Sequence, residues 1–141
     1  MPFATHADVL ARRRELTLSG DADGLAELFA PDGVIEFVFH GPPGTPVRLA
    51  GREAIREYSR HVVKSPVRLE SYEITQLHQT ADPEVVVAEM TASATVTATG
   101  RPLSAISIQV LRIRDGRIVL MRDFADPRLL EQVTGEPPAS A

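Results

Sequence analysis

Residues 105–125 read AISIQVLRIRDGRIVLMRDFA, and this stretch is the most informative about the architecture. Its two halves have the composition of β-strands, and Asp115-Gly116 separates them. An Asp-Gly pair supplies the positive φ angles of a tight hairpin turn, so two long antiparallel strands are predicted. Both faces of these strands carry apolar side chains, whereas a sheet with one wet face would alternate apolar and polar residues. We therefore expect both sheet faces to be covered.

The neighbouring sequence extends this hairpin into a larger sheet. Three breaks, at residues 81–83, 99–102 and 114–117, divide the region from 67 to 125 into four strands joined by short turns. An earlier strand is predicted over residues 34–39, where aromatic side chains occupy alternating positions. The pattern indicates a curled antiparallel meander.

Helical patterns come before these strands and after the first of them. A first helix is expected from Thr5 or Asp8, with an apolar face that Arg13 interrupts. A second begins at Asp21 or Asp23, and Pro31 should end it after Leu28 and Phe29. A third follows Gly51 and stops before Pro66, and its apolar stripe comprises Ala54, Ile55, Tyr58 and Val62. Three helices gathered against a curved antiparallel sheet predict an α+β domain.

Composition sets limits on the class of protein. A chain of 141 residues predicts one domain, which we place at residues 1–133, followed by a disordered Pro-rich tail at 134–141. The net charge of −4 argues against a nucleic-acid or anionic-membrane partner. The absence of cysteine excludes disulfides and thiol catalysis. No run reaches the ~18–20 apolar residues of a membrane span, so a cytoplasmic protein is expected.

The outer face of the predicted sheet is apolar as well and should be buried against another surface. Residues 105–111 and 118–121 are apolar on both alternating faces, and three helices suffice only for the inner one. We expect a homodimer formed through the outer sheet face.

The segment from Gly116 to Pro127, GRIVLMRDFADP, resembles the last strand of SnoaL-like proteins of the nuclear transport factor 2-like superfamily. Supporting stretches lie at Gly20-Asp21, residues 29–33 and residues 51–55, so the resemblance covers about residues 5 to 130. It implies a cone-shaped fold in which the helices and a strongly curved, antiparallel or mixed sheet enclose a pocket. Function within this superfamily varies, so each site position has to be compared separately.

The resemblance to ketosteroid isomerases does not include their catalytic residues. Arg13 stands where that family has a helix-one tyrosine, Phe37 where it has its base, and Gln109 where it has a protonated acid. Phe37 cannot move a proton, so steroid isomerisation by that mechanism is not expected.

Two other enzyme branches match better at one position. Asp123 matches the last Asp of the Asp-Arg-Asp unit of limonene epoxide hydrolase, while Met90 and Ala92 occupy the other two positions. Phenazine-biosynthesis isomerase-like proteins have a Glu in the slot of Asp123 and a helix-three histidine near Tyr58. Both resemblances thus retain an acidic residue at position 123, whereas the residues that act with it in those enzymes are different in this chain.

Asp123 is the candidate catalytic residue. By strand alternation it shares the inner face with Val119 and Met121, whose apolar side chains would desolvate its carboxyl. Burial of this kind raises the pKa of a carboxyl, so that it can donate a proton near neutral pH. The alternative is a structural anchor that pairs with Arg13 or with a backbone group.

Several further side chains are candidates for binding a ligand. Gln109 would donate from its amide, Tyr58 would aim a hydroxyl inward, and His61 could act as a base one turn further along. Arg13 either extends to the rim, the more common outcome, or reaches Asp123 or an acidic group of a substrate. The remaining candidates are interpreted as pocket wall or plain core: Phe37, Phe39, Met90 and Met121.

These residues favour a cofactor-independent enzyme that acts on a small apolar metabolite by proton transfer. Isomerisation, cyclisation or epoxide opening would suit a single acid in a dry pocket. No metal is expected, because His6, His40 and His78 lack the spacing of metal ligands. Two alternatives remain open, a non-catalytic binding or accessory protein with the same pocket and an interaction domain that uses the outer sheet.

Overall fold

The computed structural model describes residues 4–128, which form three helices and one six-stranded sheet. The helices are α1 (His6–Ser19), α2 (Ala22–Glu27) and α3 (Arg52–Val63). The strands are β1 (Phe29–Phe37), β2 (Val47–Ala50), β3 (Val67–Gln79), β4 (Val85–Val96), β5 (Arg101–Arg114) and β6 (Arg117–Ala125). The predicted tail at 134–141 lies outside the described residues.

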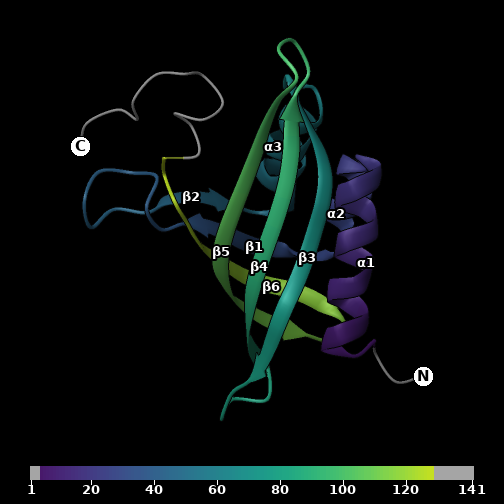
Figure 1. The fold of residues 1–141 in the computed structure, drawn as a ribbon. Helices are drawn as coiled ribbons and strands as arrows, with labels where there is room; N and C mark the ends of the chain where they lie inside the picture. Colours follow the sequence, from purple (N-terminus) through teal and green to yellow (C-terminus); the bar gives the residue numbers. More distant parts are fainter. Residues whose placement is uncertain (1–3, 129–141) are drawn as a thin grey trace.

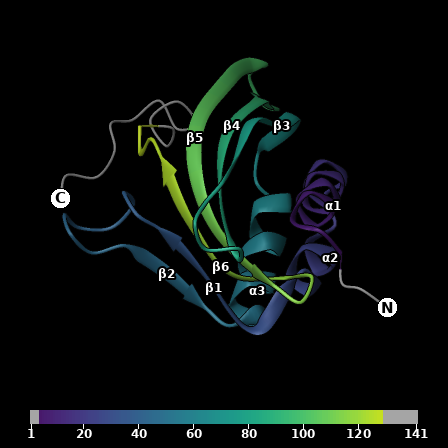
Figure 2. The same cartoon turned by 90° about the horizontal axis from the view of Figure 1, so that it is seen from below.

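The sheet is mixed and strongly curved. Its strand order is β2-β1-β6-β5-β4-β3, and every neighbouring pair is antiparallel except β1 and β6, which run parallel. The long strands β3, β4 and β5 stand side by side (Figure 1). Seen from below, the sheet bends around the three helices, which all lie on its concave side (Figure 2). The α+β class is confirmed, and the sheet stays open because β2 and β3 are edge strands.

Local sequence signals account for the ends of several elements. Thr5 caps α1 in a reciprocal capping box with Asp8, and Gly20 ends the helix with φ +72°. The turn between β5 and β6 has φ +53° at Asp115 and +74° at Gly116. These angles are those of the predicted Asp-Gly hairpin, which is confirmed.

The boundary between α2 and β1 differs from the prediction. The helix ends at Glu27, and Phe29 already belongs to the strand, where it pairs with Ile118. Pro31 lies inside β1 and does not end a helix. The strand tolerates it because regular pairing with β6 is interrupted between Phe29 and Val34, so the missing N–H leaves no ladder bond unmade.

Two features of the sheet were not expected. The short strand β2 pairs with the end of β1, from Val34 opposite Ala50 to Phe37 opposite Val47. In β6 a bulge accommodates Val119, because Ile113 pairs with Ile118 while the preceding pair joins Arg112 to Leu120. The bulge reverses the alternation, so Ile118 and not Val119 is buried with Met121. The expectation that Val119 shares the face of Asp123 is therefore wrong.

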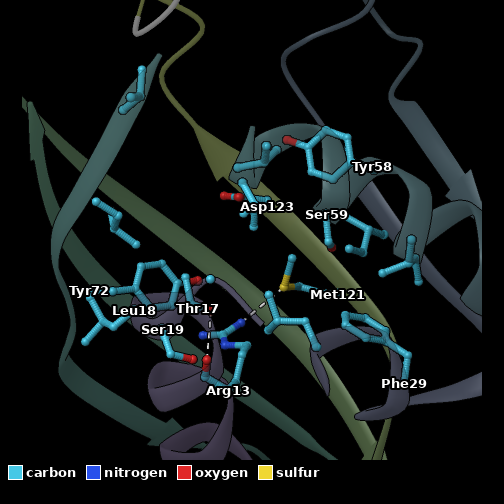
Figure 3. A pocket seen from close by; sticks show the side chains of 18 of the residues that line it. Arg13, Thr17, Leu18, Ser19, Phe29, Tyr58, Ser59, Tyr72, Met121 and Asp123 are labelled. Atoms are coloured by element: carbon cyan, nitrogen blue, oxygen red, sulfur yellow. Dashed lines mark hydrogen bonds between the residues drawn. The ribbon is translucent and has the colours of Figure 1, made fainter. Parts of the chain in front are cut away.

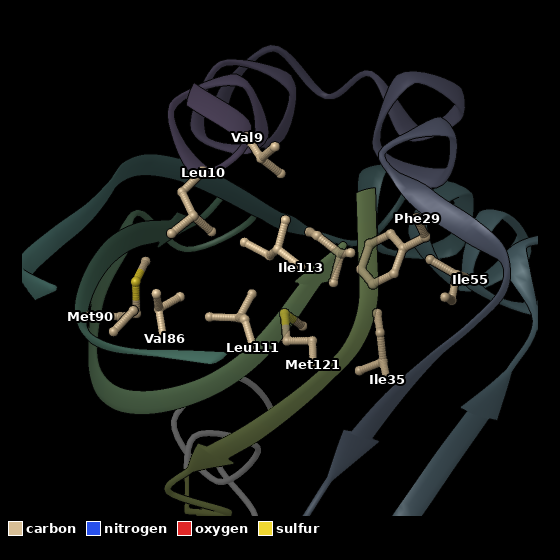
Figure 4. Close-up of a cluster of buried hydrophobic side chains, with 12 residues drawn as sticks. Val9, Leu10, Phe29, Ile35, Ile55, Val86, Met90, Leu111, Ile113 and Met121 are labelled. Atoms are coloured by element: carbon tan, nitrogen blue, oxygen red, sulfur yellow. The ribbon is translucent and has the colours of Figure 1, made fainter. Parts of the chain in front are cut away.

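The core fills the space between α1, α3 and the concave face. Its buried members come from nearly every element and include Leu10 of α1, Ile55 of α3 and Leu111 of β5 (Figure 4). Leu111 and Val86 have no exposed surface. This apolar packing holds β4, β5 and β6 at fixed positions, and side chains of β5 and β6 border a cavity beside it.

Candidate functional site

The cavity lies on the concave side of the sheet and has a volume of about 420 Å³. This volume is within the range of small-molecule sites, which span roughly 300–1,000 Å³. Most of its wall is apolar, from side chains such as Phe29, Ile35, Ile55 and Val62. Polar side chains interrupt this wall, among them Arg13, Tyr58, Tyr72 and Asp123 (Figure 3). The other polar residues of the lining are Gln109, Thr17, Ser19, Ser59 and Arg68.

Asp123 comes from β6 and borders the cavity, as the alternation past Met121 predicted. One of its carboxyl oxygens, Oδ1, is buried and has no hydrogen-bond partner among residues 4–128. Burial raises the pKa of the Asp123 carboxyl, and the nearby Arg13, Gln109 and His40 oppose this rise only in part. Desolvation thus outweighs the stabilisation that Arg13 and Gln109 give to the carboxylate, and Oδ1 itself receives no hydrogen bond from residues 4–128.

Arg13 comes from α1 and is only 3% exposed, so it does not extend to the rim. Its Nη1 donates to Gln109 Oε1 at 2.7 Å and lies 3.1 Å from Met121 Sδ. The guanidinium carbon lies 5.3 Å from the centre of the Tyr72 ring, a cation–π contact. Its Nε is buried without a partner in the described part of the chain, where Arg13 forms no ion pair. The cavity thus borders a buried cation that forms no ion pair within residues 4–128, although its charge acts on Asp123.

Gln109 of β5 connects this cation to a tyrosine that sequence reasoning missed. Its side chain is 3% exposed, and its Nε2 lies 3.2 Å from the hydroxyl oxygen of Tyr72 on β3. Irregular pairing in β3, between Leu69 and Ser71 and between Ile74 and Gln76, shifts the alternation twice. Counting alternate residues along β3 in the sequence therefore fails to predict that Tyr72 faces the cavity. The other residues of β3 are too polar to show by hydrophobic alternation which face is buried.

Tyr58 and Phe37 form the wall opposite this network. Tyr58, on α3, directs its hydroxyl toward the side where Asp123 lies (Figure 3). Burial and the charge of Asp123 both raise the pKa of this hydroxyl, although the residue as a whole is 40% exposed. The Phe37 ring packs against Tyr58 with 5.3 Å between ring centres. Met121 also borders the cavity, beside Arg13.

Three predicted ligand-binding residues lie elsewhere. Phe39 follows the end of β1, is 54% exposed and packs edge-on against Phe124, because the strand alternation stops at Phe37. Met90 is a core residue, separated from the cavity by Arg13 and Tyr72. His61 is exposed on the other side of α3, because the helical turn brings Val62 to the cavity instead.

Other classes of site have little support in residues 4–128. No three His, Asp or Glu side chains in this range come together to hold a metal ion. None of the three helices is long and apolar enough to cross a membrane. What the cavity provides is a carboxyl with a raised pKa together with neutral and cationic donors, and this combination can transfer a proton to or from a bound molecule.

A curved mixed sheet that closes over a cavity with helices on its concave side defines the ketosteroid isomerase-like, or nuclear transport factor 2-like, class of fold. Residues 11–121 match the SnoaL-like domain. The chain therefore belongs to the SnoaL-like family, as its last strand predicted.

Individual relatives agree with this assignment. An uncharacterized PhzA/B-like protein of Pseudomonas aeruginosa is 38% identical, over 91% of this chain and 89% of its own length. A Bacillus subtilis protein provisionally named an isomerase has a crystal structure with a TM-score of 0.81 and 31% identity, covering 92% of this chain and 91% of its own. The epoxide hydrolase/cyclase-like enzyme SalBIII, from salinomycin pyran ring formation, has a TM-score of 0.69 and 24% identity over 85% and 89% of the two chains.

Proposed function

We propose that this protein is a cofactor-independent enzyme that isomerises or cyclises a small, largely apolar metabolite, or opens its epoxide, with Asp123 as general acid and base. The observation that carries the proposal is the buried, unpartnered Asp123 Oδ1 in the wall of the cavity. The structural neighbours of the SnoaL-like family include epoxide hydrolase/cyclase enzymes, which makes chemistry of this kind plausible for the fold.

The environment of Asp123 suits proton transfer in both directions. A carboxyl whose pKa is raised toward the working pH is a stronger base when ionised and is present as the acid in a larger fraction of molecules. In an isomerisation, the carboxylate would take a proton from one carbon of the ligand and return it to another. Atoms and charge then balance without any external reactant.

The other polar groups would orient the ligand. Tyr58 is close enough for its pKa to respond to the charge of Asp123. The guanidinium of Arg13, which lacks an ion-pair partner within residues 4–128, favours negative charge that develops on the ligand. The expected apolar ligand would thus meet a largely apolar cavity whose wall includes the Arg13 cation.

A non-catalytic binding protein with the same cavity is the alternative. A binder gains nothing from an unpartnered carboxyl, which costs desolvation energy, and would be expected to cap it with a backbone amide. Among residues 4–128 no such cap is present. This observation favours the enzyme over the binder.

The experiment is to incubate the protein in D₂O with 2-tetralone and, separately, with styrene oxide, and to follow deuterium incorporation and ring opening by NMR. We expect Asp123→Asn to lower the protein-dependent rate by roughly 10²–10⁴-fold, the usual contribution of a general acid or base. Asp126→Asn is the matched control, because Asp126 lies three residues further on, is exposed and pairs with Arg128. Equal rates in Asp123→Asn and wild type would contradict the proposal.

We also propose that the protein is a homodimer in which the outer sheet faces pack together. Ile106 is 76% exposed and Ile108 is 45% exposed, both on the convex side of β5. In the register of the sheet Ile108 stands beside Phe124, whose ring packs against the exposed Phe39. Exposed apolar side chains that adjoin one another mark association surfaces more often than scattered ones do.

A further inference from the structure

The hydrogen bonds around Gln109 have only one consistent direction. A guanidinium has N–H donors and no acceptor, so the Gln109 atom that lies 2.7 Å from Arg13 Nη1 has to be the carbonyl oxygen Oε1. The amide nitrogen of Gln109 then faces the hydroxyl of Tyr72, at 3.2 Å. Arg13 therefore fixes which end of the amide points to Tyr72.

This direction also determines the state of the Tyr72 hydroxyl. An amide NH₂ group only donates, so the oxygen of Tyr72 accepts this bond and its own proton stays available. Among residues 4–128 the Tyr72 hydroxyl donates no hydrogen bond of its own. Because Tyr72 borders the cavity (Figure 3), a bound ligand is the acceptor within reach.

We infer that Tyr72 is a specificity-determining hydrogen-bond donor, and that the ligand presents a carbonyl oxygen to it. The inference rests on the proposed function only in using the same cavity as the binding site. Arg13 Nε is a further donor without a partner among residues 4–128, and Arg13 lines the same cavity as Tyr72. The ligand class that satisfies this wall is a small apolar ketone or enone.

A structural role for Tyr72 is the competing explanation. Its ring packs against the core and lies beside the Arg13 guanidinium, 5.3 Å from the ring centre. Such a role depends on the ring alone. The hydroxyl can therefore be tested separately, by Tyr72→Phe, which keeps the ring, and by changing the direction of the Gln109 bond.

The test compares two probes of nearly the same shape, 2-acetylnaphthalene and 2-isopropenylnaphthalene, which differ in having C=O or C=CH₂. We expect wild-type protein to bind the ketone roughly 5–10-fold more tightly by titration calorimetry, the value of one hydrogen bond in a buried site. Tyr72→Phe should reduce this ratio to near one by weakening the ketone alone. Ser71→Ala, which removes a hydroxyl that instead pairs with Ser93, should leave the ratio unchanged.

Gln109→Glu provides the second variant and keeps Tyr72 in place. A carboxylate at position 109 would accept from both Arg13 and Tyr72, so the Tyr72 proton would turn away from the cavity. The ketone preference should again fall to near one, while affinity for the hydrocarbon stays the same. A structural role for the Tyr72 ring would predict no such loss.

The outcomes separate this inference from the proposed function. A wild-type ratio near one, or a ratio that survives both Tyr72→Phe and Gln109→Glu, overturns the role of Tyr72 and leaves that of Asp123 standing. A ketone preference that persists in Asp123→Asn while turnover is also unchanged supports Tyr72 and contradicts the proposed catalysis. Failure of both probes to bind overturns the cavity as a binding site and this inference with it.

Discussion

The concave and convex faces of the sheet are built from alternating residues of the same strands, yet their polar groups behave in opposite ways. On the convex face charges are paired, as where Glu84 receives hydrogen bonds from Arg112 and Arg114 and its pKa falls to about 2. On the concave side Asp123 Oδ1 has no donor, and Arg13, which reaches this side from α1, has no ion-pair partner within residues 4–128. The unpaired groups are the ones that a ligand can satisfy.

Apolar side chains show the reverse contrast. Leu111 has no exposed surface on the concave side, whereas its near neighbour Ile106 is 76% exposed on the convex side. Burial of an isoleucine contributes roughly 1.5–3 kcal/mol, so leaving several uncovered is unfavourable in a solitary chain. Strand parity therefore separates the buried side chains of β5, such as Leu111, from its exposed ones, such as Ile106.

The largest effect should come from charging the convex face. We expect the double variant Ile106→Lys/Ile108→Lys to weaken self-association at least about 100-fold, because two lysines per chain would be buried against each other at a two-fold interface. Sedimentation velocity at micromolar concentration measures the change from dimer to monomer. Ala11→Lys, on an exposed position of α1 and thus across the sheet, is the control. A wild-type protein that already sediments as a monomer would contradict the proposed dimer.

A smaller effect concerns the pH dependence of stability. Because burial raises the pKa of Asp123 in the folded state, the folded protein binds this proton more tightly than the unfolded chain does. Stability is therefore lost as pH rises from the ordinary carboxyl pKa, about 3.9, through the raised value. Asp123→Asn removes this loss, so its melting temperature should exceed that of wild type by a few degrees at pH 7 and converge with it near pH 3. A variant less stable than wild type at pH 7 would indicate a structural anchor.

Much of the fold was predictable because local signals agree with the global arrangement. The Asp115-Gly116 turn, the cap at Thr5 and the stop before Pro66 each depend on backbone chemistry within a few residues. The start of β1 at Phe29 was not predictable in this way, since its pairing with Ile118 joins segments far apart in the sequence. The four-residue strand β2 likewise exists only through its pairing with β1.

The site was predictable where the strands are regular. Gln109 and Asp123 could be placed on the inner face because β5 and β6 pair regularly there, from Gln109 opposite Asp123 to Arg112 opposite Leu120. Val119 was misplaced and Tyr72 was missed for one shared reason, a bulge that reverses the alternation. Arg13 could be found as a charge on an apolar helical face, but its bond to Gln109 depends on how α1 packs against the sheet.

The most direct test of the account is the pKa of Asp123 itself, measured by following the side-chain carboxyl ¹³C resonance of labelled protein through a pH titration. Comparison with the spectrum of Asp123→Asn assigns the resonance. We predict an inflection above the ordinary aspartate value of about 3.9, because burial of the carboxyl outweighs the opposing effects of Arg13, Gln109 and His40. An inflection at or below that value would show a solvated or ion-paired carboxylate, and would contradict its role as the acid of the cavity.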